Sequence, residues 1–134
     1  MNAVIELHDS ECVAIEMDEE GGGFVLLDAY IHRCKGEHLM SPHEGGVQRV
    51  SMKITGMTKE GSVGDLPALI YEGSLQVGTE MQGNIVPFPA IYTVPVRLSM
   101  MLSEDARVVV VSGNRLSIEP EGDFRFVETV DFSS

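Results

Sequence analysis

An acidic, a phenolic and an imidazole side chain recur at every second position in one segment, as Asp28, Tyr30 and His32. In an extended chain this spacing places all three on one face, about 7 Å apart between successive positions. A carboxylate, a phenol and an imidazole in line could bind a polar ligand or move protons. The alternative is a solvent-facing strand end in which Tyr30 and His32 are cross-strand partners, because antiparallel sheets commonly keep one polar face. We favour this alternative and keep the three residues as the candidate ligand-binding site; Arg33 points the other way and is expected to pair with an acidic neighbour.

The consecutive residues His8, Asp9 and Ser10 contain the three residue types of a catalytic triad. A nucleophile, a base and an orienting acid must converge in space, whereas consecutive residues of an extended chain alternate sides. Asp and Ser side chains commonly bond nearby backbone amides in turns. We therefore predict that these residues form a structural turn, with His8 ending a strand, and we assign no catalytic residue.

Two further histidines, His38 and His43, lie in a segment rich in Gly, Pro, His and Glu (34–46), which we expect to be a loop. With Glu37 and Glu44 beside them they could hold a divalent ion. Cys-x-x-Cys, His-Glu-x-x-His and calcium-loop patterns are missing from the sequence, and an ordered metal site also needs supporting hydrogen bonds around its ligands. We therefore predict no metal site.

The segments that position these groups show the two-residue alternation of half-buried strands, with turn residues between them. An amphipathic helical pattern is missing, which predicts an all-β fold: one antiparallel β-barrel or β-sandwich of about eight to ten short strands. We favour a barrel, because closure removes exposed edges. A C-terminal meander should run through a hairpin at Gly113-Asn114. Pro87 and Pro89 should lie at an edge or in a connection, and Gly73 indicates a bulge or a close backbone approach. The expected strands cover residues 3–7, 12–18, 24–33, 47–55, 69–77, 94–102, 108–111, 116–118 and 124–130.

The composition indicates a single domain spanning residues 1–134, since 43% of the residues are hydrophobic and the length suits one core. A net charge of −12 should repel phosphate backbones and anionic membranes, so we expect neither nucleic acid nor a membrane as partner. The N-terminus lacks a signal-peptide pattern, and the apolar runs are shorter than the ~20 residues of a membrane helix. We therefore expect a cytoplasmic protein with both cysteines, Cys12 and Cys34, as free thiols. The glycines at 21–23 lack the Lys or helix of a phosphate-binding loop, and no cofactor is expected.

Three segments resemble a family of small uncharacterised bacterial β domains: the opening Leu7-His8-Asp9-Ser10, the strand at residues 28–33 and the region 113–127. The resemblance covers most of the chain and implies a β fold in a bacterial cytoplasmic protein. It supplies no activity. Some candidate toxin-immunity proteins open with a similar His-Asp-Ser turn, which is an analogy only.

Three functional hypotheses follow. The first is a non-enzymatic bacterial binding or interaction domain whose acidic surface meets a basic protein, for instance an immunity-type inhibitor of a basic toxin. The second is a small-ligand-binding β-barrel in which Asp28, Tyr30 and His32 supply the polar contacts. An enzyme has the least support, because the sequence offers only scattered histidines and carboxylates. Unpaired sheet edges also leave a two-fold homodimer open.

Overall fold

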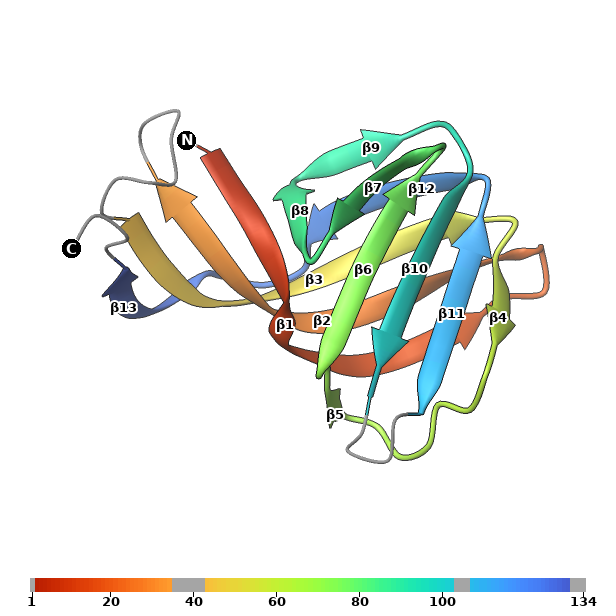
Figure 1. Ribbon diagram of the computed structural model, residues 1–134, viewed down its shortest axis with the longest axis horizontal. Helices are drawn as coiled ribbons and strands as arrows, with labels where there is room; N and C mark the ends of the chain where they lie inside the picture. The colour runs from red at the N-terminus through yellow and green to blue at the C-terminus, as the bar shows by residue number, and fades with distance from the viewer. Residues whose placement is uncertain (1, 35–42, 103–106, 131–134) are drawn as a thin grey trace.

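The computed structural model describes residues 2–34, 43–102 and 107–130, and the regular elements in these ranges are all β-strands. They form two antiparallel sheets, as Figure 1 shows, which confirms the all-β prediction. The sheets do not close into a barrel, so the barrel favoured from the sequence is not borne out. Within the described ranges, nothing helical has the length and apolar character needed to cross a membrane.

The larger sheet is built on three long strands from the first part of the chain. β1 pairs with β2 and β2 with β3, and shorter strands then extend both sides of this unit. β5 and β8 pair with β1, β12 and β13 pair with β3, and β9 pairs with β12. The bounds are β1 (Asn2–Met17), β2 (Gly22–Cys34), β3 (His43–Thr55), β5 (Ala68–Leu69), β8 (Ile85–Phe88), β9 (Ala90–Tyr92), β12 (Arg115–Pro120) and β13 (Arg125–Val130).

The smaller sheet lies over one part of the larger one, in the order β4-β11-β10-β6-β7. The longer strands of both sheets turn alternate side chains toward the space between the sheets, and these side chains form the core. Leu27 and Met52 from the larger sheet and Leu98 and Val111 from the smaller one are examples, each at most 1% exposed. The bounds are β4 (Thr58–Glu60), β6 (Glu72–Val77), β7 (Glu80–Gly83), β10 (Val96–Met101) and β11 (Val108–Gly113).

Gly73 allows the two sheets to approach each other closely. A Cβ atom at this position of β6 would lie 2.7 Å from Cβ of Leu7 in β1, nearer than such atoms come in proteins. The close backbone approach predicted at Gly73 is therefore confirmed.

The three long strands continue past the smaller sheet. In Figure 1 the start of β1, the end of β2, the start of β3 and β13 lie to the left, away from the smaller sheet. β3 serves both regions in succession, because residues 50–55 pair with β12 and residues 43–47 pair with β13. We call the left-hand region the lobe, and define it as residues 2–6, 28–34, 43–49 and 125–130.

The predicted C-terminal meander is wrong beyond β11. β10 and β11 pair as expected, but β11 and β12 belong to different sheets. The Gly113-Asn114 link carries the chain from one sheet to the other instead of closing a hairpin. Asn114 N donates to Thr55 O at 2.8 Å, which holds the link against the end of β3. β12 therefore pairs with β3, and no local sequence pattern predicts this pairing.

The segment at residues 34–46, which was expected to be a loop, is partly β-strand. Residues 35–42, which include His38, lie outside the described residues, but residues 43–46 already belong to β3. Glycines weaken a strand because they leave it without side chains to pack. Here aromatic rings fill that space: a Cβ at Gly45 would overlap Tyr30, and one at Gly46 would overlap Phe124.

The proline-containing segment lies at an edge of the larger sheet, as predicted. β8 contains Pro87 and pairs only with β1 among the described strands, and β9, after Pro89, ends the strand order. The described ranges hold thirteen strands, more than expected, because several edge strands are only two to four residues long.

Candidate functional site

The candidate residues Asp28, Tyr30 and His32 share the outer face of β2, as their spacing predicts. Leu27, Ala29 and Ile31, which alternate with them, are buried on the core side. In the folded protein, however, the three side chains do not share one set of contacts. Tyr30 and His32 contact each other edge to face, with ring centroids 5.0 Å apart, whereas Asp28 is bound to another partner.

Tyr30 reaches across β3 to β13. Gly45 stands between them, and because it lacks a side chain the Tyr30 hydroxyl passes over it and donates to Glu128 Oε1. The pKa of Tyr30 lies well above its usual value, first because burial disfavours the phenolate and then because of the hydrogen bond and the charge of Glu128. Glu6 and Asp9 raise the pKa of Tyr30 further. Tyr30 is therefore a neutral donor at physiological pH.

His32 lies between two partners from neighbouring strands. Its Nδ1 atom lies 2.8 Å from Nε2 of His43 in β3, and its Nε2 atom lies 3.3 Å from Oε2 of Glu6 in β1. Both histidines are buried, with exposed fractions of 8% for His32 and 4% for His43. The sequence placed His43 in a loop beside His38, and the structure joins it to His32 instead.

Metal ligation finds little support in this cluster. Glu6 and His43 contact opposite nitrogens of the His32 ring, so the three groups do not converge on one point. In the part of the chain that the structure describes, no group of three or more His, Cys, Asp or Glu side chains is placed to hold a metal ion. His38 and Glu37 lie outside that part.

Asp28 belongs to a separate ion pair. Arg49, opposite it on β3, donates from Nε to Oδ1 at 2.9 Å and from Nη2 to Oδ2 at 3.0 Å. These bonds hold the pKa of Asp28 below its usual value, against the opposing effect of partial burial. A carboxylate held in this way by two guanidinium nitrogens is a structural partner of Arg49.

Arg33 points to the other face of the lobe, as expected. Its Nε atom lies 3.4 Å from Oε1 of Glu44, and its guanidinium carbon lies 3.7 Å from the centre of the Phe124 ring. The predicted pairing with an acidic neighbour is thus observed, and the stacking on Phe124 adds a cation–π contact.

His8, Asp9 and Ser10 form a bulge inside β1, where a turn between two strands was expected. The β1–β2 pairing is interrupted between Glu6 and Glu11, and Asp9 has a φ of 84°. His8 and Asp9 are exposed, while Ser10 is fully buried, so the three side chains do not converge. One strand continues through the interruption because Ser10 supplies hydrogen bonds that the ladder lacks there.

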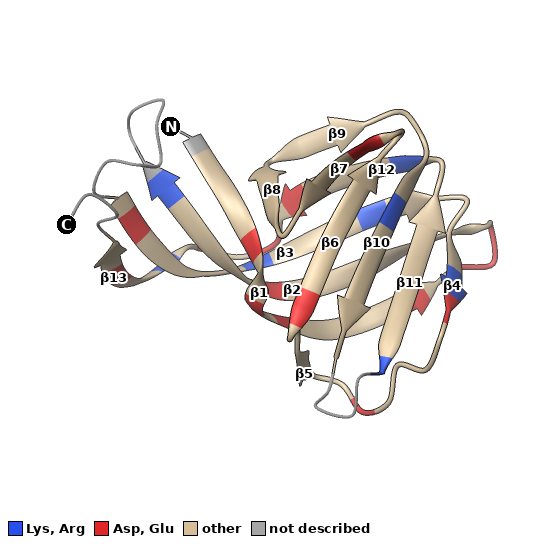
Figure 2. Ribbon diagram, in the orientation of Figure 1, with Lys and Arg blue, Asp and Glu red and all other residues tan. Residues whose placement is uncertain are grey.

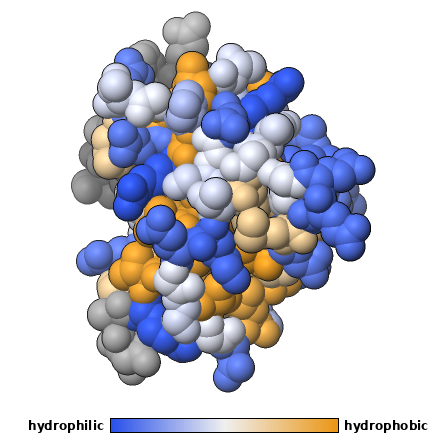
Figure 3. Space-filling model, turned by 90° about the vertical axis from the view of Figure 1, so that its right-hand side faces the viewer, coloured by the Kyte–Doolittle hydropathy of each residue, from blue (hydrophilic) through white to orange (hydrophobic). Residues whose placement is uncertain are grey.

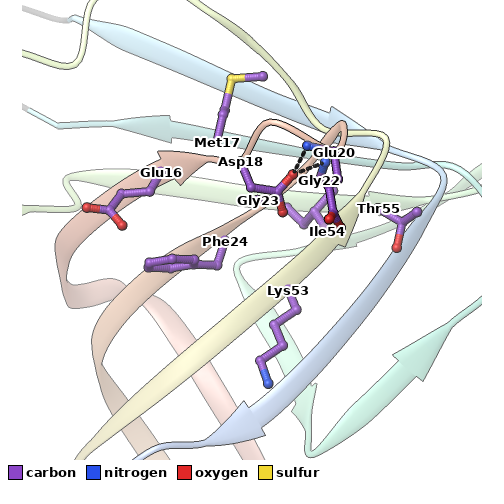
Figure 4. A pocket seen from close by; sticks show the side chains of 10 residues that line it. All are labelled: Glu16, Met17, Asp18, Glu20, Gly22, Gly23, Phe24, Lys53, Ile54 and Thr55. Atoms are coloured by element: carbon purple, nitrogen blue, oxygen red, sulfur yellow. Dashed lines mark hydrogen bonds between the residues drawn. The ribbon is translucent and has the colours of Figure 1, made fainter.

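An open pocket of about 500 Å³ lies at the opposite end of the larger sheet, beside the β1–β2 hairpin (Figure 4). The hairpin supplies three exposed carboxylates, from Glu16, Asp18 and Glu20, and Phe24 contributes a half-buried ring. Asp18 Oδ1 accepts hydrogen bonds at 2.9 Å from the backbone nitrogens of Glu20 and Gly22, which fixes the turn. Figure 2 shows this hairpin as an acidic tip at the right-hand end of the molecule.

Lys53 is the cation in the pocket lining, and it is already paired. Its Nζ atom lies 2.9 Å from Oε2 of Glu119 on the neighbouring strand β12. The pocket therefore keeps an excess of negative charge. No residue of this pocket was among the site residues predicted from the sequence. The sequence does contain one indication of the pocket, because alternation places Glu16, Phe24 and Lys53 on the outer faces of their strands. The register that sets these three residues side by side is known only from the structure.

Comparisons of the chain with protein-family models, with curated proteins and with solved structures find no match.

Proposed function

We propose that this chain is a non-enzymatic binding domain whose acidic surface meets a basic protein partner. The observation that carries the proposal is the hairpin pocket, whose lining contains the carboxylates of Glu16, Asp18 and Glu20 together with the ring of Phe24. A carboxylate neutralises a Lys or Arg side chain, and an aromatic face attracts the same cation. The pocket thus suits a cationic side chain presented by a partner.

The charge of the whole chain supports the same partner class. A net charge of −12 creates a long-range field that accelerates the approach of a basic protein and disfavours acidic ones. In the view of Figure 3, hydrophilic residues cover much of the surface, and hydrophobic residues gather in its lower half. An inhibitor of a basic toxin, whose carboxylates occupy the toxin's cationic cleft, is the specific form that we favour.

The geometry of β2 gives less support to the hypothesis of a small-ligand site at Asp28, Tyr30 and His32. Tyr30 donates to Glu128, Asp28 is held by Arg49, and His32 contacts Glu6 and His43. The polar ends that would orient a ligand are therefore engaged within the chain. A ligand at this position would have to replace bonds that already exist, which lowers the net gain.

The experiment that tests the proposal is a titration with an oligo-arginine peptide, followed by amide chemical shifts. We expect shifts concentrated at the hairpin and at residues 53–55. The double variant Glu16→Gln/Glu20→Gln should weaken binding on the order of fivefold, because two carboxylates of the pocket are neutralised. Asp18 is left unchanged because it fixes the turn.

The matched control is the double variant Glu60→Gln/Glu72→Gln, which makes the same charge change at exposed positions of the smaller sheet. This variant should retain binding within about twofold, because Glu60 and Glu72 lie outside the pocket lining and salt screens their action on a peptide bound there. Equal weakening by both variants, or shifts spread evenly over the surface, would show that the pocket is not a binding site.

A further inference from the structure

The outer face of the smaller sheet carries few charges, although the chain as a whole has a net charge of −12. In Figure 2 this face is turned toward the viewer, and most of its ribbon is tan. A second copy of the chain is repelled least at such a charge-poor surface. On the three central strands the outward residues lie in three rows: Gln76, Arg97 and Ser112; Ser74, Ser99 and Val110; and Glu72, Met101 and Val108.

Arg97 and Glu72 are the charged residues of the three rows, and they stand at opposite ends of the face. Glu72 pairs with Met101, four residues along β10 from Arg97, which corresponds to about 13 Å. Both side chains are exposed, and within residues 2–34, 43–102 and 107–130 neither makes an ion pair. The face therefore has one cationic end and one anionic end.

A shallow hollow of about 190 Å³ lies beside Glu72, at the anionic end. Ser74 and Ser99 line one part of it with short side chains, and Met101 and Val108 line another part with apolar ones. An arginine side chain has an apolar stem and a cationic head that binds carboxylates. The hollow thus suits an arginine that enters from outside the chain, because Arg97 stands at the other end of the same face.

A two-fold axis can bring Arg97 of one copy to the hollow of another. If the axis crosses the strands at the row of Ser99, it exchanges the two ends of the face. The two sheets then pack face to face with nearly aligned strands, which is a common arrangement of sheets. Each Arg97 comes to lie over Met101 of the other copy and next to its Glu72, so the contact is made twice.

We propose that the chain forms a two-fold dimer through the outer face of its smaller sheet, in which each Arg97 occupies the hollow beside Glu72 of the second copy. Five strands about 4.8 Å apart and five residues of about 3.3 Å each give a footprint of about 20 by 17 Å. An interface of this size is small, and Glu60 on the edge strand β4 adds some repulsion at its rim. The dimer is therefore reversible. It leaves the hairpin pocket of the larger sheet accessible and does not depend on the function proposed above.

Sedimentation velocity of the whole chain, at about 10 µM to about 1 mM, tests the dimer. The wild type should show a monomer–dimer equilibrium in this range. Glu72→Arg or Arg97→Glu alone should weaken association on the order of tenfold, because two ion pairs become two like-charge contacts. A wild type that stays monomeric at the highest concentration would overturn the proposal.

An equimolar mixture of the two variants gives the sharpest readout. Glu72→Arg in one copy and Arg97→Glu in the other restore opposite charges at both contacts. The mixture should therefore form a heterodimer with an affinity within about threefold of the wild-type value. Circular dichroism checks that each variant is folded. Folded variants that associate no better when mixed than alone would show that the two residues do not meet.

Arg115→Glu is the matched control, since Arg115 is exposed on β12 of the larger sheet. This variant makes the same charge change as Arg97→Glu outside the face, and it should dimerise within about twofold of the wild type. Equal weakening by Arg115→Glu and Arg97→Glu would mean that net charge alone governs association, against the proposal.

Amide chemical shifts of the wild type on dilution locate the interface without any variant. The shifts should change at residues 97–101 and 108–112, which belong to the face, and stay constant at the β1–β2 hairpin. Changes confined to the larger sheet would place the contact between copies elsewhere and overturn the proposal.

Discussion

The buried hydroxyl of Ser10 accepts a hydrogen bond at 2.9 Å from the backbone nitrogen of Tyr30, in place of a β1 carbonyl group. The same hydroxyl donates to the carbonyl oxygen of Glu6 at 2.6 Å. The two contacts lie where residues 7–10 of β1 stand against the single residue 29 of β2, so the regular ladder is interrupted. A side chain therefore maintains the sheet at its bulge, between Glu6 of β1 and Tyr30 of β2.

Ser10→Ala should destabilise the fold by about 2 kcal/mol, because it leaves a donor and an acceptor of the backbone without this partner in a buried place. Urea unfolding followed by circular dichroism measures the change. Ser62→Ala, at an exposed loop position, should change the free energy of unfolding by less than about 0.5 kcal/mol. A Ser10→Ala protein as stable as the wild type would mean that the hydroxyl is dispensable.

Asp28→Asn should lower the melting temperature at neutral pH and have no such effect in strong acid. Arg49 keeps the pKa of Asp28 in the folded state below that in the unfolded state. Such a carboxyl stabilises the fold above its unfolded pKa, and this contribution is lost as the pH falls through the folded pKa. Thermal unfolding over a pH series checks the expectation.

The control for Asp28→Asn is Asp123→Asn, which removes an exposed carboxyl in the turn after β12. This variant should change the melting temperature less at neutral pH. If the difference between wild type and Asp28→Asn stayed constant down to the lowest pH, packing rather than the ion pair would be its cause.

Gly73→Ala should destabilise the protein by about 1–3 kcal/mol, because the added methyl group meets the Cβ atom of Leu7 and forces the sheets apart. Gly122→Ala is the matched control, since the nearest atom to its Cβ would be 3.5 Å away, an ordinary contact. Chemical denaturation of the two variants gives the comparison. Equal stability of Gly73→Ala and Gly122→Ala would contradict the close approach of β6 and β1.

Cys12 should resist thiol reagents while the protein is folded. Its side chain is fully buried, and burial raises the pKa of the thiol to about 12, so the reactive thiolate is scarce at pH values near 8. In a Cys34→Ser background, a chromogenic disulfide reagent should label Cys12 only after denaturation. Rapid labelling of the native protein would show that the β1 strand opens readily at this point.

The candidate site was partly predictable. Alternation placed Tyr30 and His32 on one face of β2, and it placed Arg33 on the other. Alternation could not reveal their partners, because Glu128 and His43 belong to β13 and β3 and reach the site through pairing register. Asp28 followed the same pattern as Tyr30 and His32, yet Arg49 opposite it takes its carboxylate away from them.

The sequence by itself determined the strand character of the chain and the inward side chains of strands such as β2, because both depend on a two-residue period that is local. The tertiary structure alone decided which strands pair. β3 takes both β12 and β13, and Gly113-Asn114 crosses between sheets, although its residue types also suit a hairpin. Such pairings join residues far apart in the chain, and their free energy comes from packing and backbone hydrogen bonds that short patterns do not encode.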